Sequence, residues 1–280
     1  MTDLHMRERQ GFTGKLNDAI LERVHFVSRR LNLPQIESKF PHLSVSDGSW
    51  RKSPPGDDVN LATFIDHTLL KPEATQALIM KLCKEARDHR FHAVCVNGSR
   101  VRCCVKALKG SGVRVAACCG FPLGAGSTEA KVAEAVAAVR DGAADIDMVI
   151  NVGAVKERNY CLVYSDIKAV VDACGHNVTT KVIFETCLLT PEEIIDCCIL
   201  SVAAGASFVK TSTGFNIGGA TPEAVDMMLA TVGNEAKVKV SGGVRDRETA
   251  LQYVKVGVSR IGTSSGIAII THTGRSRSKY

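Results

Sequence analysis

The sequence predicts an α/β protein, a (β/α)8 TIM barrel with a helical extension at its amino end. From residue 61 onward, short runs of β-branched and other apolar residues alternate with longer stretches of helical periodicity. Eight such units follow one another in about 220 residues, within the usual size of this barrel. The chain is 45% hydrophobic and 23% charged, as expected for a protein with a large core. A doubly wound open sheet would give the same alternation and is the structural alternative.

The first half of the barrel contains four predicted strand and helix pairs. The strands are LATFI (61–65), AVCV (93–96), VRVAAC (113–118) and DIDMVI (145–150). The helices that follow them are expected at 75–87, before Gly110, at 128–140 and at 160–173. Their lengths suit helices that cross over between parallel strands.

The second half repeats the pattern four times. The strands are KVIFE (181–185), SFVK (207–210), KVKV (237–240) and VSRIG (258–262). The helices open at Thr190-Pro191, at Thr221-Pro222, after Asp246 and at Ser264. Both Thr-Pro pairs fit a capping threonine with proline at the first helical position, and Glu193 completes a capping box with Thr190.

Residues 1–60 differ from the rest and are predicted to form an extension, with the barrel domain at 61–280. Apolar residues recur at helical spacing at Leu16, Ile20, Val24, Val27 and Leu31. A proline-interrupted segment follows this helix. We expect the helix to pack on the barrel, preferably over its amino-terminal end, with self-association as the alternative.

Charge and cysteine content limit the partners and the compartment. The formal charge of +6 is spread along the chain, which does not favour a nucleic-acid arm or a basic membrane patch. No apolar run reaches the roughly 18 residues that a membrane span needs. The eleven cysteines include three adjacent pairs and no C-x-x-C, so they indicate free thiols in a reducing compartment. We expect a cytoplasmic protein that acts on a small molecule, with a homodimer or another homo-oligomer left open.

Three lysines lie within or at the end of consecutive predicted strands: Lys181, Lys210 and Lys239. In this fold the chemistry takes place at the carboxyl ends of the strands, where neighbouring strands would bring the three amines together. A single strand lysine more often extends its stem toward the rim, but three in a row favour a functional cluster. Burial beside like charges lowers the pKa of an amine, and a neutral lysine can attack a carbonyl to form a Schiff base. The cluster therefore predicts a class I aldolase or another imine-forming lyase.

Carboxylates accompany these lysines. Asp145 and Asp147 share one face of their predicted strand, because side chains alternate along a strand. A carboxylate beside lysines stays ionised and could serve as a general base, although a structural ion pair explains it equally well. Asp66, after the first predicted strand, offers another acid, and its neighbour His67 fits a core histidine.

Two glycine-rich loops suggest a phosphate site. Ser241-Gly242-Gly243 follows the seventh strand, and residues 262–266 join the eighth strand to its helix. Barrel enzymes commonly bind phosphate at these two loops, where glycines let backbone N–H groups approach the anion. Thr213-Gly214 would extend this site, although glycine turns are routine in barrels and each loop alone is weak support. No metal-ligand spacing or nucleotide fingerprint is present, so we expect no metal and no organic cofactor.

Six strings occur in order within residues 61–280: FIDHTLLKP, CGFPLGAG, DIDMVINVGA, KVIFET, FVKTSTGF and VKVSGGVR. Together they resemble the deoxyribose-phosphate aldolases. The resemblance implies a barrel lyase that reversibly cleaves 2-deoxy-D-ribose 5-phosphate to acetaldehyde and D-glyceraldehyde 3-phosphate without a metal. It also implies a role in the catabolism of deoxyribonucleosides.

The resemblance further implies residue roles. Lys210 matches the Schiff-base lysine, Lys239 matches a second lysine that depresses its pKa, and Asp147 matches the aspartate that moves protons with a water. Tyr280 matches a terminal tyrosine that assists protonation of the enamine. The positions that match the substrate pocket are Asp66, Thr68, Cys95, Lys181 and Thr213. Those that match the phosphate site are Gly214, Gly242, Gly243, Gly262, Ser264 and Ser265.

Two departures from the family pattern carry expectations of their own. Asn97-Gly98 replaces a proline-containing turn, which predicts a more mobile loop, and Phe215 stands where some members have a lysine near the phosphate.

An aldolase with another aldehyde donor is the rival function, because it would share the lysine and the phosphate loops. A non-enzymatic barrel scaffold is disfavoured because all the expected reactive positions are filled.

Overall fold

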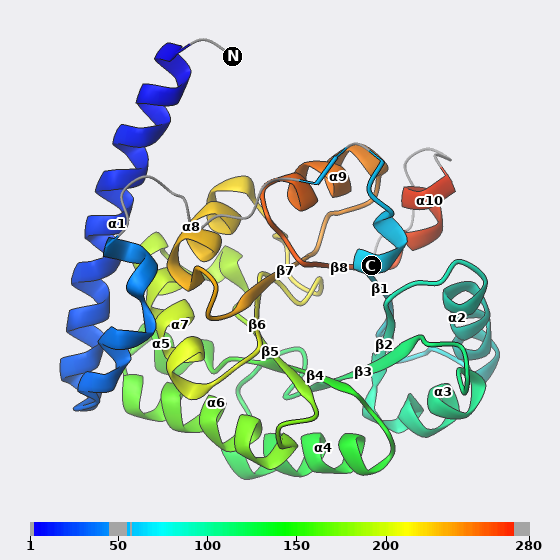
Figure 1. Cartoon of the computed structure of the whole chain (residues 1–280). Coiled ribbons are helices and arrows are strands. Elements are labelled where there is room, and N and C mark those ends of the chain that lie inside the picture. The colour runs from blue at the N-terminus through cyan, green and yellow to red at the C-terminus, as the bar shows by residue number, and fades with distance from the viewer. Residues whose placement is uncertain (1–2, 45–54, 57, 272–280) are drawn as a thin grey trace.

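The computed structural model describes residues 3–44, 55–56 and 58–271, and it contains the expected closed barrel (Figure 1). Eight parallel strands pair in chain order, and β1 closes the barrel on β8. The strands are β1 (Ile65–Leu69), β2 (Ala93–Asn97), β3 (Arg114–Cys119), β4 (Asp145–Val149), β5 (Thr179–Ile183), β6 (Phe208–Lys210), β7 (Lys237–Ser241) and β8 (Arg260–Thr263). The (β/α)8 prediction is confirmed, and the closure between β1 and β8 excludes the open sheet.

A ring of helices surrounds the strands. The helices are α1 (Asp3–Leu31), α2 (Gln76–Asp88), α3 (Val101–Ala107), α4 (Thr128–Arg140), α5 (Val152–Lys156), α6 (Tyr160–Cys174), α7 (Pro191–Ala204), α8 (Pro222–Val232), α9 (Arg247–Lys255) and α10 (Gly266–Thr271). Short 3-10 turns are η1 (Pro34–Lys39), η2 (Pro41–Ser44), η3 (Leu61–Phe64), η4 (Gly98–Arg100) and η5 (Thr186–Leu188). The capping box of α7 forms as predicted, since Thr190 and Glu193 exchange hydrogen bonds. No helix among the described residues is long and apolar enough to span a membrane.

The first strand begins four residues later than the LATFI run predicted. The Asn60 side chain accepts a hydrogen bond from the Ala62 N–H at 3.1 Å, and Thr63 Oγ1 donates to the Asn60 carbonyl at 2.8 Å. These bonds fold residues 61–64 into the 3-10 turn η3, as polar side chains that bond to nearby backbone often do. The correction moves Asp66 from the end of the strand to its second residue, deeper in the barrel.

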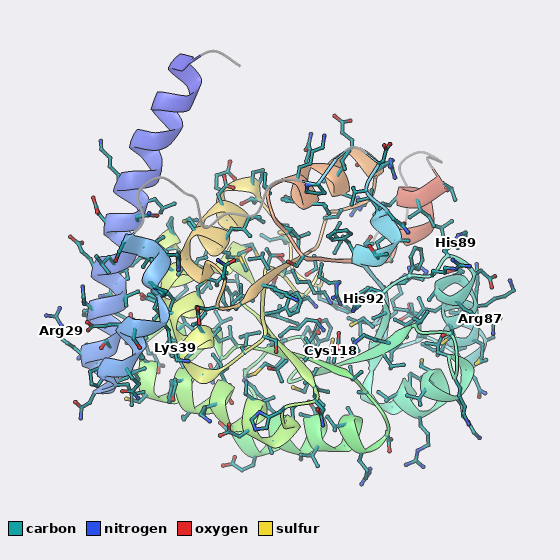
Figure 2. All side chains as sticks on the ribbon, in the orientation of Figure 1. Arg29, Lys39, Arg87, His89, His92 and Cys118 are labelled. Carbon is teal, nitrogen blue, oxygen red and sulfur yellow. The ribbon has the colours of Figure 1, made fainter. Side chains whose placement is uncertain are left out.

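The strand register brings the predicted reactive residues together. Asp147 on β4 is paired with Lys181 on β5, and Lys210 on β6 is paired with Lys239 on β7. Residues at equivalent positions in neighbouring strands face the same side of a sheet. The interior of the barrel therefore holds charged side chains, whereas Arg29 and Arg87 extend outward from the molecule (Figure 2).

Helix α1 lies along the outside of the helical ring, against α7 and beside α6 and α8 (Figure 1). Its residues Ile20, Val24 and Val27 are fully buried there. This position corrects the expectation that the helix covers the amino-terminal end of the barrel. Helix α7 explains the position, because ten of its fourteen residues are buried and it is apolar on both faces. A helix that is hydrophobic all round needs a second covering element.

One buried ion pair links helices α1 and α7. Arg23 of α1 donates to both carboxylate oxygens of Asp196 on α7, at 2.8 and 2.6 Å. The Tyr160 hydroxyl also donates to Asp196 at 2.7 Å. The Asp196 side chain is only 2% exposed, so its charge depends on these partners.

We predict that Arg23→Ala lowers the free energy of unfolding by about 2–3 kcal/mol, because it leaves a buried carboxylate with the tyrosine alone. Urea unfolding followed by circular dichroism measures the change. Arg102→Ala is the control: its ion pair with Asp141 has an arginine side chain that is 74% exposed, and we expect a loss below about 1 kcal/mol. Equal losses in the two variants would show that Arg23 adds no more than a surface charge.

Candidate active site

Three lysines converge on one carboxylate inside the barrel. Asp147 Oδ2 accepts hydrogen bonds from Lys210 Nζ at 2.9 Å and from Lys239 Nζ at 2.8 Å. Asp147 Oδ1 accepts a third from Lys181 Nζ at 2.7 Å. The side chains of Lys181, Lys239 and Asp147 are 0% exposed and that of Lys210 is 3% exposed. The inward orientation that the strand pattern predicted for the three lysines is therefore present.

Two further aspartates extend this cluster. Asp66 accepts from Lys239 Nζ at 2.5 Å and from Arg260 at 3.1 Å. Asp145 accepts from Lys181 Nζ at 2.9 Å and from Arg114 at 2.5 Å. We call Lys181, Lys210, Lys239, Arg260, Asp66, Asp145 and Asp147 the charge cluster. Within it, Lys210 is the lysine with a single carboxylate partner.

The carboxylates of the charge cluster are held in their ionised form. Burial would raise the pKa of Asp147, but the three lysines outweigh burial and place that pKa well below its ordinary value. Burial likewise opposes the charge of Asp66, and the positive charges of Lys239 and Arg260 lower its pKa below the usual range. Both carboxyl groups are therefore negative at neutral pH, and Asp147 is available as a proton acceptor.

Two of the lysines keep their protons. Burial would lower the pKa of Lys239, but Asp147 and Asp66 outweigh it and hold that pKa well above its usual value. For Lys181, burial is again the largest influence, and the charges of Asp147 and Asp145 give a net rise in pKa. Four buried cationic side chains thus share three carboxylates. Asp145 also accepts from the partly exposed Arg114, and among the three lysines Lys210 has the fewest carboxylate partners.

The residues predicted to line the substrate pocket fall at two depths. Asp66, Cys95 and Lys181 are fully buried, with Cys95 Sγ 3.8 Å from Cys118 Sγ. Thr68 is partly exposed, and its hydroxyl donates to the Asp66 carbonyl at 2.8 Å. His67, on the opposite side of β1, bonds to Glu85 at 2.8 Å and lies against Phe91, as expected of a core histidine. Thr213 is also buried, at 5% exposed, so Thr68 is the one member of this set that is partly open to solvent.

Thr213 points to a residue that the sequence analysis did not select. Its hydroxyl donates to the carboxylate of Glu185, and its N–H donates to the same carboxylate at 3.3 Å. Glu185 follows β5 and is 4% exposed. The available signal was a charged residue that ends an apolar strand run, as for Lys210, but its side-chain partner could not be read from the sequence.

The glycines predicted to bind phosphate lie at the carboxyl ends of β6, β7 and β8. Ser241 on β7 is paired with Gly262 on β8, so the loops that follow these strands leave the barrel side by side. Gly214, Gly242 and Gly243 have φ values of 84°, 79° and 89°, a region that L side chains rarely adopt. A Cβ on Gly262 would lie 3.1 Å from Lys239 Cε, so the absence of a side chain at this position leaves room for the Lys239 side chain.

The other predicted phosphate residues lie in the turn after β8. Ser265 is buried, and its N–H donates to Thr263 Oγ1 at 2.9 Å, while Ser264 is partly exposed. The helix expected from Ser264 begins at Gly266 and has six residues. Tyr280 lies outside the described residues. Among the described residues, no group of three or more His, Cys, Asp or Glu could hold a metal ion.

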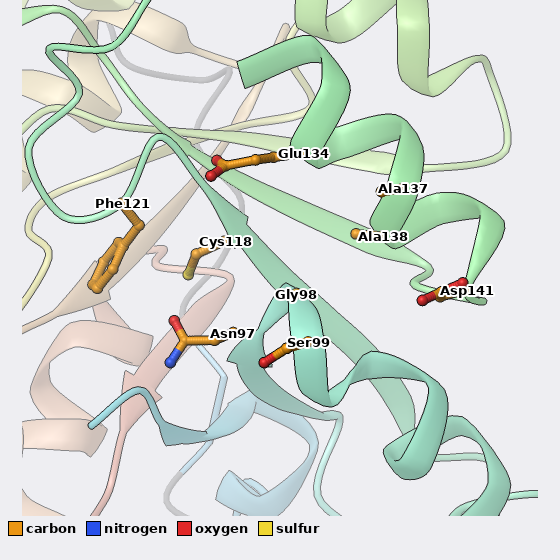
Figure 3. A pocket seen from close by; sticks show the side chains of 9 residues that line it. All are labelled: Asn97, Gly98, Ser99, Cys118, Phe121, Glu134, Ala137, Ala138 and Asp141. Carbon is orange, nitrogen blue, oxygen red and sulfur yellow. The ribbon is translucent and has the colours of Figure 1, made fainter. Parts of the chain in front are cut away.

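Two cavities flank the loop after β3. The larger, of about 380 Å³, lies between this loop, the turn after β2 and helix α4 (Figure 3). Its lining includes Asn97, Cys118, Phe121 and Glu134. The smaller, of about 120 Å³, is lined in part by Leu123, Glu185, Thr213 and Phe215.

The two departures from the family pattern have structural partners. The Asn97 amide donates to the Leu70 carbonyl at 3.1 Å, and Arg100 donates to the Ala74 carbonyl at 2.9 Å, so the turn η4 is tied to the loop after β1. The Phe215 ring meets Phe121 edge to face, with 5.2 Å between centroids. Phe215 therefore joins the loops after β3 and β6 through an apolar contact.

A buried amine beside an ionised carboxylate, at the carboxyl end of a barrel with glycine-rich loops, defines an imine-forming aldolase. Comparison with known proteins agrees, because the model of the DeoC/LacD family of aldolases matches residues 61–272. The chain belongs to this family. The sequence resemblance and the prediction of a class I aldolase are thereby confirmed.

Individual relatives cover most of the chain. The deoxyribose-phosphate aldolase of Brevibacillus brevis is 53% identical over 222 residues, which are 79% of this chain and 100% of that protein. A Coccidioides immitis structure, provisionally assigned to the same enzyme, is 42% identical with a TM-score of 0.77, covering 80% of this chain and 89% of that one. The deoxyribose-phosphate aldolase of Aeropyrum pernix, a tetramer, is 32% identical with a TM-score of 0.70, covering 75% and 89%. The region that matches the family model, residues 61–272, coincides with the barrel.

The depressed pKa values predict how stability depends on pH. A carboxyl group whose pKa is lower in the folded state stabilises the fold above its unfolded pKa of about 3.9, and this contribution disappears as the pH falls. We expect the free energy of unfolding to decline steeply below about pH 4 in the native protein and less steeply in Asp66→Asn. Urea unfolding at several pH values gives the slopes.

The control for this experiment is Asp172→Asn, which removes an exposed carboxylate from the ion pair with Lys168. Its slope should equal that of the native protein. The decisive quantity is the slope, since Asp66→Asn also lowers stability at pH 7 by leaving Lys239 and Arg260 with fewer partners. An unchanged slope in Asp66→Asn would contradict the assigned charge of Asp66.

Proposed function

We propose that this protein reversibly cleaves 2-deoxy-D-ribose 5-phosphate to acetaldehyde and D-glyceraldehyde 3-phosphate through a Schiff base on Lys210. The observation that carries the proposal is the contact of Lys210 Nζ with Asp147 at 2.9 Å, next to a charged Lys239. Membership of the DeoC/LacD aldolases and the name of the Brevibacillus brevis relative support the same reaction.

Lys210 is the preferred nucleophile for two reasons. It has one carboxylate partner, whereas Lys181 and Lys239 each have two. It is also the last residue of β6, at the carboxyl end where substrates of barrel enzymes bind. The positive charge of Lys239 nearby disfavours a second ammonium group, and a neutral amine is the form that attacks a carbonyl.

The proposed reaction starts with attack of the Lys210 amine on C1 of the open-chain sugar. Proton transfer through Asp147 converts the adduct to a carbinolamine, which loses water to give a cationic imine. The imine accepts the electron pair of the C2–C3 bond as that bond breaks and the C3 hydroxyl gives up its proton. Glyceraldehyde 3-phosphate leaves, the enamine is protonated on carbon, and hydrolysis of the imine releases acetaldehyde and regenerates Lys210.

The remaining predicted roles are part of the proposal. The glycines at 214, 242, 243 and 262, with Ser264 and Ser265, would bind the phosphate through backbone N–H groups and hydroxyls. Thr68 and Cys95 would contact the sugar, and Tyr280 would assist protonation of the enamine. Binding energy at the phosphate end would orient C1 against Lys210 and so increase turnover as well as affinity.

We also propose that the protein works in the cytoplasm as a homo-oligomer in deoxyribose phosphate catabolism. All eleven cysteines are free, and thiols in this number suit a reducing compartment. The tetramer formed by the Aeropyrum pernix aldolase supports self-association. Light scattering of the full chain would test it, and a monomer at all concentrations would count against it.

Borohydride trapping tests the central assignment. With 2-deoxy-D-ribose 5-phosphate, reduction should fix an adduct on Lys210 that peptide mapping locates, and Lys210→Met should lose both adduct and activity. Lys237→Met, at an exposed lysine of β7, is the control and should retain both. An active protein with its adduct on another lysine would refute the assignment. Release of a different aldehyde from other phosphosugars would favour the rival aldolase.

The role of Lys239 predicts a shift in the pH profile. Lys239→Met removes a positive charge close to Lys210, and loss of a like charge favours the protonated amine, so the pH of half-maximal imine formation should move to higher pH by at least about 1 unit. Activity at pH 7 should fall by about 100-fold and recover in part at pH 9. Lys239→Arg, which keeps the charge, should show a smaller shift. A loss that is equal at all pH values would indicate a purely structural role.

A further inference from the structure

Glu185 is a buried carboxylate that the proposed reaction does not use. It is 4% exposed and follows β5, next to the strand that ends in Lys210. No ion pair to it occurs among the described residues, although a buried carboxylate normally requires a cation or several hydrogen-bond donors. Its backbone is also unusual, with φ 59° and ψ 61° in the left-handed region. A buried carboxyl group without a cationic partner, on a left-handed backbone, indicates a specific task.

The partners of this carboxylate all belong to short loops at the barrel mouth. The N–H of Thr213 donates to Glu185 Oε1 at 3.3 Å, and the hydroxyl of Thr213 donates to Oε2. The Cys187 thiol contacts Oε1 at 4.0 Å. The Thr213 oxygen in turn accepts the N–H of Phe215 at 3.1 Å. The Thr213 hydroxyl therefore uses its one donor hydrogen in the bond to Glu185.

These contacts continue the pairing of β5 and β6 beyond the ends of the strands. The strand β6 has three residues, and its last carbonyl, that of Lys210, accepts the N–H of Phe184 at 2.9 Å. The Thr211 carbonyl accepts the N–H of Thr186 at 2.9 Å. Between these two bonds, the left-handed turn directs the Glu185 side chain toward Thr213. In a longer pair of strands, a backbone carbonyl would accept the next N–H of the chain after β6. Here the Glu185 carboxylate accepts the Thr213 N–H instead.

We propose that Glu185 is a positioning residue that fixes the loop 211–215 relative to Lys210. This inference rests on the proposed function, in which Gly214 belongs to the phosphate site. By holding both donors of Thr213, Glu185 sets the direction of the Gly214 N–H and the distance from the phosphate site to the reacting amine. It also changes the expected role of Thr213, which orders the loop and does not donate to the substrate.

The test compares substrates with and without a phosphate. In Glu185→Ala, kcat/KM for 2-deoxy-D-ribose 5-phosphate should fall by about 100-fold, through both a lower kcat and a higher KM, because the phosphate site is displaced relative to Lys210. For unphosphorylated 2-deoxyribose, kcat/KM should change by less than about 3-fold. Inorganic phosphate should also inhibit the variant more weakly than the native protein. Equal losses for the two sugars would overturn the inference.

Two further variants separate the carboxylate from the backbone. Glu185→Gly removes the carboxylate and suits the left-handed conformation, so it should lose the phosphate preference as Glu185→Ala does. If Glu185→Gly retained native kinetics, the residue would matter for its backbone alone, and the inference would fail. Arg90→Ala is the matched control: Arg90 also has a positive φ of 53° but is exposed at the turn before β2. It should keep the native preference for the phosphosugar.

The remaining measurements distinguish this inference from the proposed function. Borohydride trapping of 2-deoxyribose on Lys210 should persist in Glu185→Ala, since the amine and Asp147 are unchanged. Absence of trapping on Lys210 in the native protein would refute the proposed function instead. If Glu185→Ala does not fold, Thr213→Val provides the same comparison from the other side of the contact. A native phosphate preference in Thr213→Val would then overturn the inference.

Discussion

The charge balance around Asp147 is the interaction on which the rest of the site depends. One carboxylate accepts hydrogen bonds from three lysines, and two more aspartates satisfy the outer lysines and Arg260. In an interior of low dielectric, removing any one partner would leave an uncompensated charge, so each member constrains the ionisation of the others. The arrangement keeps Lys181 and Lys239 protonated and gives Lys210 a single carboxylate partner.

The barrel supplies the geometry that this balance requires. Parallel strands in chain order place Asp147, Lys181, Lys210 and Lys239 on four consecutive strands, and the register aligns them within two layers. Gly262, on the next strand, leaves room for the stem of Lys239. The covering helices have their own requirement, because α7 is apolar on both faces and must be covered by α1. Residues on the strands therefore form the charged interior, and residues on the helices form the apolar layer around it.

Features that depend on periodicity or on residue chemistry could be predicted from the sequence. Features that depend on single contacts could not. Alternating runs and capping signals predicted the barrel, and lysines on consecutive strands predicted the cluster. The start of β1 was wrong because the Asn60 side chain, which no periodicity reveals, folds LATFI into a turn. Asp66 consequently lies deeper than expected. The position of α1 needed the all-round burial of α7, and Glu185 needed a left-handed backbone that only the structure shows.

The same charge balance bears on the order of steps in the proposed reaction. The proposed reaction begins with a neutral Lys210, which lies among the charged side chains of Lys181, Lys239 and three aspartates. Formation of the imine adds a positive charge at this position, on the atom conjugated with the sugar. Cleavage of the C2–C3 bond delivers an electron pair to that nitrogen and removes this added charge. The fixed charges therefore favour the enamine over the cationic imine, which is stabilisation of the bond-breaking step by preorganised electrostatics.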